Sequence, residues 1–277
     1  MNSLLRIAPL TGFLMVLTPS ALALPNPPDI IPTKYGAIKI TPIYHASMQI
    51  EYRNRVIQID PFSQGDYTGA KKADYIFITH THPDHLDPSA ISRLVQAKGT
   101  TTIVGPASVI EKFQHYRASP KANFVKIGNG EAGGEANAGS PTPSQTASLI
   151  AYEAVPAYNI VRGPKPGEKY HPKGEFNGYV LSMGGKRIYI SGDTEATPEM
   201  KALKNIDVAF VSMNLPYTMT PQEAAKGVKA FKPKIVYPYH YRYPFTKPND
   251  NPQQFQKALA GSGIQVRIRN WYAHPAG

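Results

Sequence analysis

The sequence predicts a protein of the mixed α/β (α+β) class in which two β-sheets are covered by helices. In both halves of the chain, short apolar runs alternate with turn-forming residues, as strands do. Stretches with helix-capping signals stand between these runs in each half. Removal of a short leader from the 277 residues leaves enough chain for one large core. This pattern favours two layers of sheet with helices packed outside them.

The first half begins, after a proline-rich lead, with a series of predicted strands. The second and third of them are joined by a turn at Arg53-Asn54. A later strand is apolar for most of its length, so it should be buried, and it ends in a histidine. The strands predicted here are residues 37–44, 47–52, 55–62, 73–80 and 101–105.

Two helices are predicted in the same half. For the first, Asp87 is a suitable N-cap, Pro88 suits the first helical position, and Gly99 lies just past the expected end. The second is expected near residues 106–116.

The low-complexity segment 128–148 is rich in Gly, Ala, Ser and Pro. It is predicted to be a flexible surface insertion, since the motifs on its two sides look like parts of one site. Residues 24–277 are therefore expected to form a single domain.

The second half repeats the pattern of the first. Gly184-Gly185 is suited to a two-residue hairpin turn, and Thr220 with Glu223 forms a capping box for a helix that ends near Phe231. A last helix is expected from Asn251-Pro252 to Gly261. The strands predicted here are residues 148–158, 178–183, 186–193, 206–214, 234–240 and 264–272.

The first 23 residues have the layout of a secretory signal peptide. Arg6 precedes an apolar run over residues 7–17, and the small-residue pattern Ala21-Leu22-Ala23 follows. The run is shorter than the roughly 20 residues that span a bilayer, although a retained anchor is the alternative. We therefore expect cleavage after residue 23, export to the periplasm or the medium, and no stable membrane anchor.

The composition limits the chemistry. The chain has no cysteine, which excludes disulfides and thiolate metal ligands. Its formal net charge of +11 can favour acidic ligands. The lysines are scattered, with no basic stripe interleaved with aromatic residues, so no nucleic-acid partner is expected. Nothing in the sequence indicates an oligomeric state.

The segment FITHTHPDHLDP, residues 77–88, contains His80, His82, Asp84 and His85. In extended chain, residues two apart point the same way, so the first two imidazoles can face one point. Asp84 and His85 follow where the chain turns and can face a second point. Imidazole and carboxylate suit zinc, manganese or iron. The alternative is a polar turn that binds nothing, but buried imidazoles need partners for both nitrogens.

The pattern H-x-H-x-D-H over residues 80–85 resembles the signature of the metallo-β-lactamase superfamily. Other landmarks of that family follow in order within residues 37–242: Asp60 in IQIDPF, Asp193 in YISGDTE and His240 in YPYHY. The segments HASMQIEY, VPAYN and HPKGEFNGYVL are most similar to the branch that includes the ascorbate-phosphate lactonase-like hydrolases. The resemblance implies a four-layer αββα sandwich of the metallo-β-lactamase type. It also implies that Asp193 bridges two metals, His240 is a ligand, and Asp60 orients ligands.

One landmark departs from the family pattern. Many members carry a histidine where this chain has Tyr158-Asn159. The nearest substitute is His171, on a loop that could fold back over the metals. The alternative is that His171 is a surface residue of this basic loop. We expect ligation, because the first metal would otherwise be under-coordinated.

The implied centre holds two divalent metal ions, zinc in the first place, with manganese or iron as alternatives. The ligands would be His80, His82, His171 and Asp193 for one metal, and Asp84, His85, Asp193 and His240 for the other. A shared water would lose a proton near neutral pH and attack a carbonyl or phosphorus centre. The expected catalytic residues are Asp84, which would steer the water or pass on its proton, and Asp193. A single-metal site stays open.

The expected function is that of an exported metal-dependent hydrolase acting on a small molecule with an ester, lactone, amide or phosphoester bond. The loop 162–173 carries four basic residues against Glu168, which favours an anionic substrate. The alternative is a metal-dependent binding protein of the same fold without catalytic activity, favoured by the departure at Tyr158-Asn159. Nucleic-acid processing would gain from the basic charge, but export counts against it.

Overall fold

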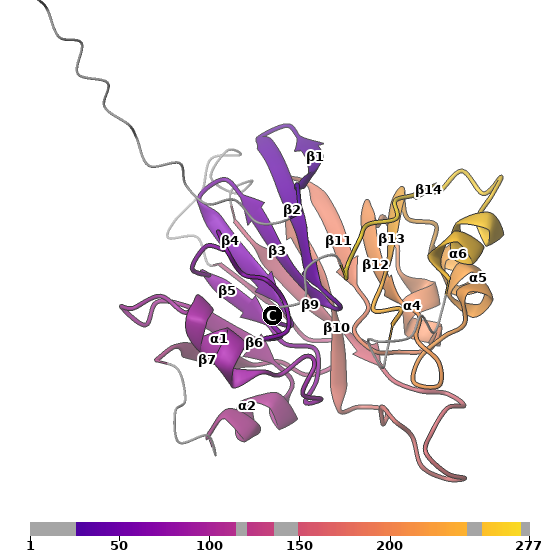
Figure 1. The fold of residues 1–277 in the computed structure, drawn as a ribbon, viewed down its shortest axis with the longest axis horizontal. Coiled ribbons are helices and arrows are strands. Elements are labelled where there is room, and N and C mark those ends of the chain that lie inside the picture. The colour runs from indigo at the N-terminus through magenta and orange to yellow at the C-terminus, as the bar shows by residue number, and fades with distance from the viewer. Residues whose placement is uncertain (1–25, 115–120, 136–148, 243–250, 273–277) are drawn as a thin grey trace, which may run out of the picture.

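The computed structural model describes residues 26–114, 121–135, 149–242 and 251–272 (Figure 1). The predicted signal peptide lies outside these ranges, as do residues 136–148 of the predicted insertion.

The first half of the chain forms a seven-stranded sheet in which strand order follows the sequence. The pairings from β1 to β4 are antiparallel, and those from β4 to β7 are parallel. The strands are β1 (Asp29–Thr33), β2 (Gly36–Tyr44), β3 (Ser47–Tyr52), β4 (Arg55–Ile59), β5 (Tyr75–Phe77), β6 (Thr102–Gly105) and β7 (Asn123–Lys126).

The second half forms another seven-stranded sheet with the same sequential order. The pairings from β8 to β11 are antiparallel, and those from β11 to β14 are parallel. The strands are β8 (Ala132–Gly134), β9 (Ala151–Ala157), β10 (Phe176–Met183), β11 (Lys186–Ile190), β12 (Val208–Ser212), β13 (Ile235–Tyr239) and β14 (Gln265–Val266).

Helices cover the outer face of each sheet. In Figure 1, α1 and α2 lie beside the first sheet, and α4, α5 and α6 lie on the far side of the second. The two sheets face each other between these outer layers, so the predicted αββα sandwich is confirmed. The helices are α1 (Pro88–Leu94), α2 (Ala107–Gln114), α4 (Pro198–Ala202), α5 (Pro221–Phe231) and α6 (Pro252–Ala258).

Two hydrophobic clusters hold these layers together. The larger includes residues of both sheets, such as Ile50, Phe77, Tyr179 and Phe210, and continues under the helices of the second half. The smaller joins α1 and α2 to the first sheet. The backs of both sheets are thus fixed, and the loops after their strands rest on a rigid base.

Two local predictions are confirmed in detail. Gly184 and Gly185 form the turn of the β10–β11 hairpin with φ angles of +58° and +73°. Such angles cost glycine little and other residues about 1 kcal/mol. The Thr220–Glu223 capping box is present, and α5 runs to Phe231 as expected.

Other boundaries differ from the prediction. Helix α1 ends at Leu94, well before Gly99, because Val95 is already extended. The predicted strand 264–272 pairs only over Gln265–Val266. Beyond it the chain crosses to pack the fully buried Trp271, whose indole N–H donates to the carbonyl of Pro238 at 3.0 Å. Backbone pairing ends where this tertiary contact takes over.

The described part of the predicted surface insertion 128–148 is not a loop throughout. Its first part forms a turn at Gly128–Glu131 and then β8, which pairs with β9 through backbone hydrogen bonds. Those hydrogen bonds are made by the backbone and do not depend on side chains, so the strand could not be predicted from a glycine-rich sequence.

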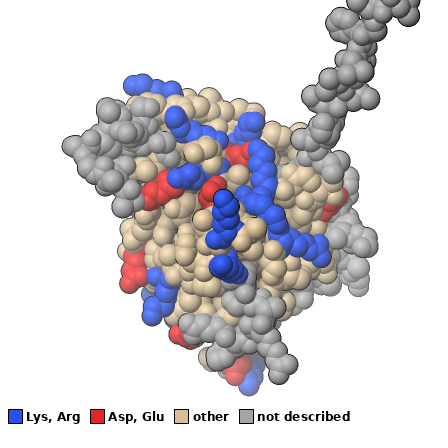
Figure 2. All heavy atoms as spheres, turned by 90° about the vertical axis from the view of Figure 1, so that its left-hand side faces the viewer, with Lys and Arg blue, Asp and Glu red and all other residues tan. Residues whose placement is uncertain are grey.

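The surface carries charges of both signs. Figure 2 shows basic side chains across the face on the left of Figure 1, with acidic side chains among them. Some pair directly, as Lys71 with Glu51 and Arg55 with Glu135 do. Among the described residues, no helix combines the length and apolar character needed to cross a bilayer.

Candidate metal centre

The residues predicted to bind metal lie beyond the carboxyl ends of strands that belong to both sheets. His80 follows β5, Asp193 follows β11, and His240 follows β13. His171 comes from the loop between β9 and β10 and is 1 % exposed, so it is not the surface residue of the alternative interpretation. The fold therefore brings all seven predicted residues to one place.

The first group consists of His80, His82 and His171. One ring nitrogen of each lies within 4.8 Å of one in each of the others. The Nε2 atom of His171 also lies 3.4 Å from Oδ2 of Asp193. These are the four residues predicted to surround one metal.

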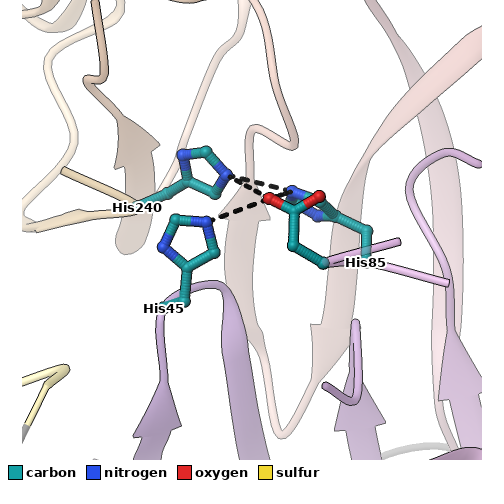
Figure 3. Close-up of side chains that lie close together, drawn as sticks. His45, His85 and His240 are labelled. Atoms are coloured by element: carbon teal, nitrogen blue, oxygen red, sulfur yellow. Dashed lines mark hydrogen bonds and ion pairs between the residues drawn. The ribbon is translucent and has the colours of Figure 1, made fainter. Parts of the chain in front are cut away.

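The second group consists of Asp84, His85 and His240, and its two histidines lie between the carboxylates of Asp84 and Asp193. The Nε2 atoms of His85 and His240 lie 3.6 Å and 3.3 Å from Oδ1 of Asp193. The same nitrogens lie 3.7 Å and 3.5 Å from Oδ2 of Asp84. Figure 3 shows the rings of His85 and His240 turned toward each other. Asp193 thus faces one group with each of its oxygens.

A network behind the groups fixes two histidine rings. The buried Asp60 accepts hydrogen bonds from the Thr79 amide, the Thr79 hydroxyl and His85 Nδ1, each at 2.8 Å. The Thr79 hydroxyl oxygen lies 2.9 Å from His80 Nδ1 and can accept its proton. Both rings therefore present Nε2 to the centre, and Asp60 has the orienting position expected of it.

The departure at Tyr158-Asn159 has a structural explanation. The Asn159 side-chain oxygen accepts hydrogen bonds from the backbone amide and from Nδ1 of His171, both at 2.8 Å. Asn159 is itself anchored by donating to the Tyr217 carbonyl at 2.8 Å. It thus orients His171, the histidine predicted to take the place of the missing one. A side-chain amide directly after a buried strand was the available signal in the sequence.

Several buried polar atoms of the centre lack a hydrogen-bond partner among the described residues. They include His80 Nε2, His171 Nε2 and Asp193 Oδ1. His85 Nε2 and His240 Nε2 lie only 3.0 Å apart, beside two carboxylates. Buried polar atoms without partners are costly, and a cation among them would relieve that cost. The donor set of imidazoles and carboxylates fits a divalent transition metal.

The electrostatics of the cluster indicate where positive charge belongs. Burial lowers the pKa of His85, but the carboxylates of Asp84, Asp193 and Asp60 outweigh it and raise the pKa to about 9. Burial raises the pKa of Asp193, yet the rings of His240 and His85 outweigh it and hold the pKa well below its usual value. Burial and the nearby His171 lower the pKa of His82 to about 4. The centre therefore holds charged carboxylates that favour a cation.

His45 lies beside the second group. Its Nε2 atom is 3.1 Å from Oδ2 of Asp84, and its ring packs on His240 with centroids 3.7 Å apart. Burial and the neighbouring His240 lower the pKa of His45 to about 3. His45 therefore contacts two members of the second group.

Three residues of the site region have left-handed backbone conformations. The φ angles of His45, Asp60 and His240 are +57°, +41° and +50°. Such conformations are unfavourable for these residues and persist only where the surrounding structure holds them. Here they turn side chains at strand ends toward a common point.

A pocket of about 280 Å³ opens over the centre. Its wall includes Tyr170 and Tyr217, whose rings meet edge to face with centroids 4.9 Å apart. The described residues that line it include no lysine or arginine.

The lysines of the loop 162–173 have partners away from this pocket. Lys165 pairs with Glu168, Lys173 pairs with Glu199, and Lys169 donates to backbone carbonyls. They do not themselves provide a cationic lining for the pocket.

A family model described as a β-lactamase superfamily domain matches residues 39–240. This chain belongs to that superfamily. The match covers most of both sheets and ends at His240, so it spans every residue of the two groups.

Curated relatives of this β-lactamase superfamily protein are named UPF0173 metal-dependent hydrolases. One from Archaeoglobus fulgidus is 30 % identical over 240 residues, which cover 83 % of this chain and 94 % of the relative. One from Thermococcus onnurineus is 31 % identical over 243 residues, 83 % of this chain and 96 % of the relative. The predicted enzyme class, a metal-dependent hydrolase of this superfamily, is confirmed by these relatives.

Solved structures agree. One is a protein from Parabacteroides distasonis described as a metal-dependent hydrolase. It is 42 % identical to this chain, with a TM-score of 0.71, and the match covers 88 % of this chain and 98 % of that one. A metallo hydrolase from Ignicoccus hospitalis has 23 % identity, a TM-score of 0.64 and coverage of 84 % and 95 %, which shows the shared fold. The narrower resemblance to the ascorbate-phosphate lactonase-like branch stays a prediction.

Proposed function

We propose that the protein is an exported hydrolase with two divalent metal ions, zinc in the first place and manganese or iron as alternatives. Its substrate is a small molecule with an ester, lactone, amide or phosphoester bond. The observation that carries the proposal is the position of Asp193, which directs Oδ2 to His171 and Oδ1 to His85 and His240. A carboxylate between two sets of imidazoles is suited to bridging two cations.

The residues divide the work as follows. His80, His82, His171 and Asp193 would hold one ion, and Asp84, His85, Asp193 and His240 the other. When bound, such ions lower the pKa of water to about 7 and polarise the bond under attack. Asp84 lies in the pocket wall with 17 % of its side chain exposed, so its carboxylate can orient water and accept a proton.

The pocket limits the substrate. A volume of about 280 Å³ fits a small molecule, and the edge-to-face pair Tyr170–Tyr217 offers an apolar wall. With the loop lysines occupied elsewhere, an anionic group would be recognised through the charge of the ions. Replacing Lys165, Lys169 and Lys173 by Gln should then leave KM for an anionic substrate unchanged.

A hydrolase is favoured over a binding protein of the same fold without activity. The departure at Tyr158-Asn159 was the sequence feature that favoured the binding protein, and here the Asn159 side-chain oxygen accepts from His171 Nδ1. This contact supports counting His171 among the candidate ligands.

The test combines metal analysis of the mature protein with a screen of lactones, β-lactams and phosphodiesters. Asp193→Ala should lose both ions and all hydrolysis. Asp66→Ala is the control. It removes a carboxylate outside the pocket whose Oδ1 accepts from the Thr68 amide, and this variant should keep its metal content and its hydrolytic activity. Full metal content in Asp193→Ala would contradict the bridging role. Mass spectrometry of the exported chain should find a new N-terminus at residue 24.

A further inference from the structure

His45 connects the candidate centre to the C-terminal segment of the chain. It is fully buried at the end of β2. Its Nε2 atom lies 3.1 Å from Oδ2 of Asp84, and its Nδ1 atom lies 2.9 Å from the hydroxyl of Tyr272. The ring thus stands between a carboxylate of the second group and a tyrosine far along the sequence. Figure 3 shows His45 beside His240 and His85.

The hydroxyl of Tyr272 decides which way these hydrogen bonds run. Its oxygen accepts from the backbone amides of Tyr241 and Arg242, at 3.1 Å and 3.0 Å. A hydroxyl has two lone pairs and one hydrogen, so the remaining partner must receive that hydrogen. That partner is His45 Nδ1. Since Nδ1 accepts, the ring proton is on Nε2, which then donates to Asp84.

We propose that His45 is a positioning residue of this site: Tyr272 and Asp84 together fix its tautomer, and its Nε2–H holds the carboxylate of Asp84 in place for the second metal. The proposal rests on the proposed function, since it assigns Asp84 to that metal. It also means that His45 is not itself a ligand, although it lies within 4.8 Å of Asp84, His85 and His240. A nitrogen that carries a proton has no lone pair for a cation.

The backbone of His45 makes it a rigid support. Its amide donates to the Trp271 carbonyl at 3.1 Å, and its carbonyl accepts from the His240 amide at 3.3 Å. Three segments that meet at the site are therefore tied to one residue. Hydrogen-bond partners behind a metal ligand matter for affinity, and their loss typically costs 10–100-fold.

The first test reads the tautomer directly. Long-range ¹H–¹⁵N spectra of histidine-labelled, metal-free protein at neutral pH should show His45 with the proton on Nε2. Tyr272→Phe should leave the proton on Nε2, because Asp84 still accepts it, and should shift the Nδ1 resonance by removing the hydroxyl that donates to that nitrogen. Tyr241→Phe is the matched control, because that buried hydroxyl donates to the Arg269 carbonyl at 3.1 Å and not to His45. A His45 proton on Nδ1 in the unmodified chain would overturn the proposal.

The second test measures zinc affinity by competition with a chelator. His45→Gln retains an N–H donor near the position of Nε2, whereas His45→Leu does not. Both replace the residue in the same left-handed conformation, so the backbone penalty is shared. We expect the second zinc to bind about 10–100-fold more weakly in His45→Leu and to recover most of its affinity in His45→Gln. Equal losses in both variants would mean that His45 ligates the metal.

These readouts separate the two proposals. The tautomer and the zinc affinity do not require hydrolysis to be observed. If Asp193→Ala keeps its metal while the His45 proton is on Nε2, the positioning role of His45 is supported and the proposed function is wrong. If zinc binds and substrates are cleaved while the His45 proton is on Nδ1, the proposed function is supported and the positioning role of His45 is wrong.

Discussion

At the scale of single residues, the centre depends on which nitrogen each histidine presents. His85 and His171 are held at Nδ1 by Asp60 and Asn159, so their Nε2 atoms face the carboxylates of the site. Orientation is therefore settled before any cation arrives. Pre-set donors are expected to raise affinity because fewer side chains must be ordered on binding.

Asn159 offers a direct test of this orientation. Asn159→Leu removes the acceptor for His171 and should weaken zinc binding at the first group about 10–100-fold. Asn159→Asp keeps an oxygen acceptor for Nδ1 and should retain most of the affinity. Chelator competition measures both, and equal affinity in the two variants would remove Asn159 from this role.

The pH dependence of metal binding follows from His85. Its pKa of about 9 in the metal-free protein lies above the ordinary 6.5, so the ring carries a proton at pH 7 that the ion must displace. Zinc affinity should rise about tenfold per pH unit from 7 to 9 and then level off. The same shift stabilises the metal-free fold fully below pH 6.5, and this stabilisation is lost as pH rises through 9.

Calorimetry across that range checks the prediction. The apparent affinity, corrected for buffer protons and zinc hydrolysis, should show the slope of one released proton. A flat profile would show that His85 is neutral before the ion binds.

Residue types and spacing predicted metal ligands in the HTHPDH segment, whereas Asp193, His240 and His171 were predicted through the resemblance to the family. The residues that support these candidate ligands were not all visible in the sequence. Asn159 and Tyr272 did not stand out, because amides and phenols are common in any core. Their roles depend on distances between segments far apart in the sequence.

At the scale of elements, the ends of the strands position the candidate ligands. Gly192 shows how tightly the segments at these strand ends pack against one another. Gly192 follows β11 with a φ of +61°, and an added Cβ would lie 2.9 Å from the Asn177 carbonyl and 3.1 Å from Thr79 Cβ. Thr79 in turn contacts Asp60 and His80. The turn before Asp193 thus presses on the network behind the histidines.

Gly192→Ala should therefore destabilise the fold by about 1–3 kcal/mol and weaken zinc binding. Gly185→Ala is the matched control, because it has a φ of +73° but no atom within 4 Å of the added Cβ. It should cost about 1 kcal/mol and leave zinc affinity unchanged. Denaturant unfolding and chelator competition measure the two effects. Unchanged zinc affinity in Gly192→Ala would contradict the coupling.

The capping box of α5 gives a prediction confined to stability. Thr220→Ala removes the side-chain acceptor for the Glu223 amide, and we expect a loss of about 1 kcal/mol. Thr100→Ala, at an exposed threonine outside any cap, should have a much smaller effect. Calorimetry should show a fall in Tm of roughly 2–4 °C for a domain of this size. No change in Tm would mean that the capping box is dispensable.

Local chemistry explains which elements were predicted well. The hairpin at Gly184-Gly185 and the helix after Thr220 are set by neighbouring residues, so their boundaries were correct. The end of α1 and the short β14 are set by packing against distant segments, so their boundaries were wrong.

At the scale of the whole molecule, the two sheets repeat one plan. Each has three antiparallel pairings followed by three parallel ones. The parallel strands of both sheets supply candidate ligands from their carboxyl ends, and the β9–β10 loop adds His171. The class of fold was predictable from this repetition in the sequence, whereas the meeting of the two halves at the site was predicted only through the resemblance to the family.

Metal removal should loosen the whole domain. A ligand that binds only the folded state at 100 times its Kd stabilises it by about 2.7 kcal/mol. Treatment with EDTA should therefore lower Tm by several degrees, and stoichiometric zinc should restore it. Asp193→Ala serves as the control, since its Tm should not respond to either. An unchanged Tm on chelation of the unmodified protein would exclude a tightly bound structural role for the ions.

The division of the candidate ligands between the two sheets has a consequence for maturation. His80, His82 and His85 belong to one sheet, whereas Asp193 and His240 belong to the other, so a newly made half-molecule lacks a finished cage. Under the proposed function, the complete set of ligands forms only after both halves have packed together. With the proposed export in an unfolded state, the metal would then be taken from the supply outside the cytoplasm.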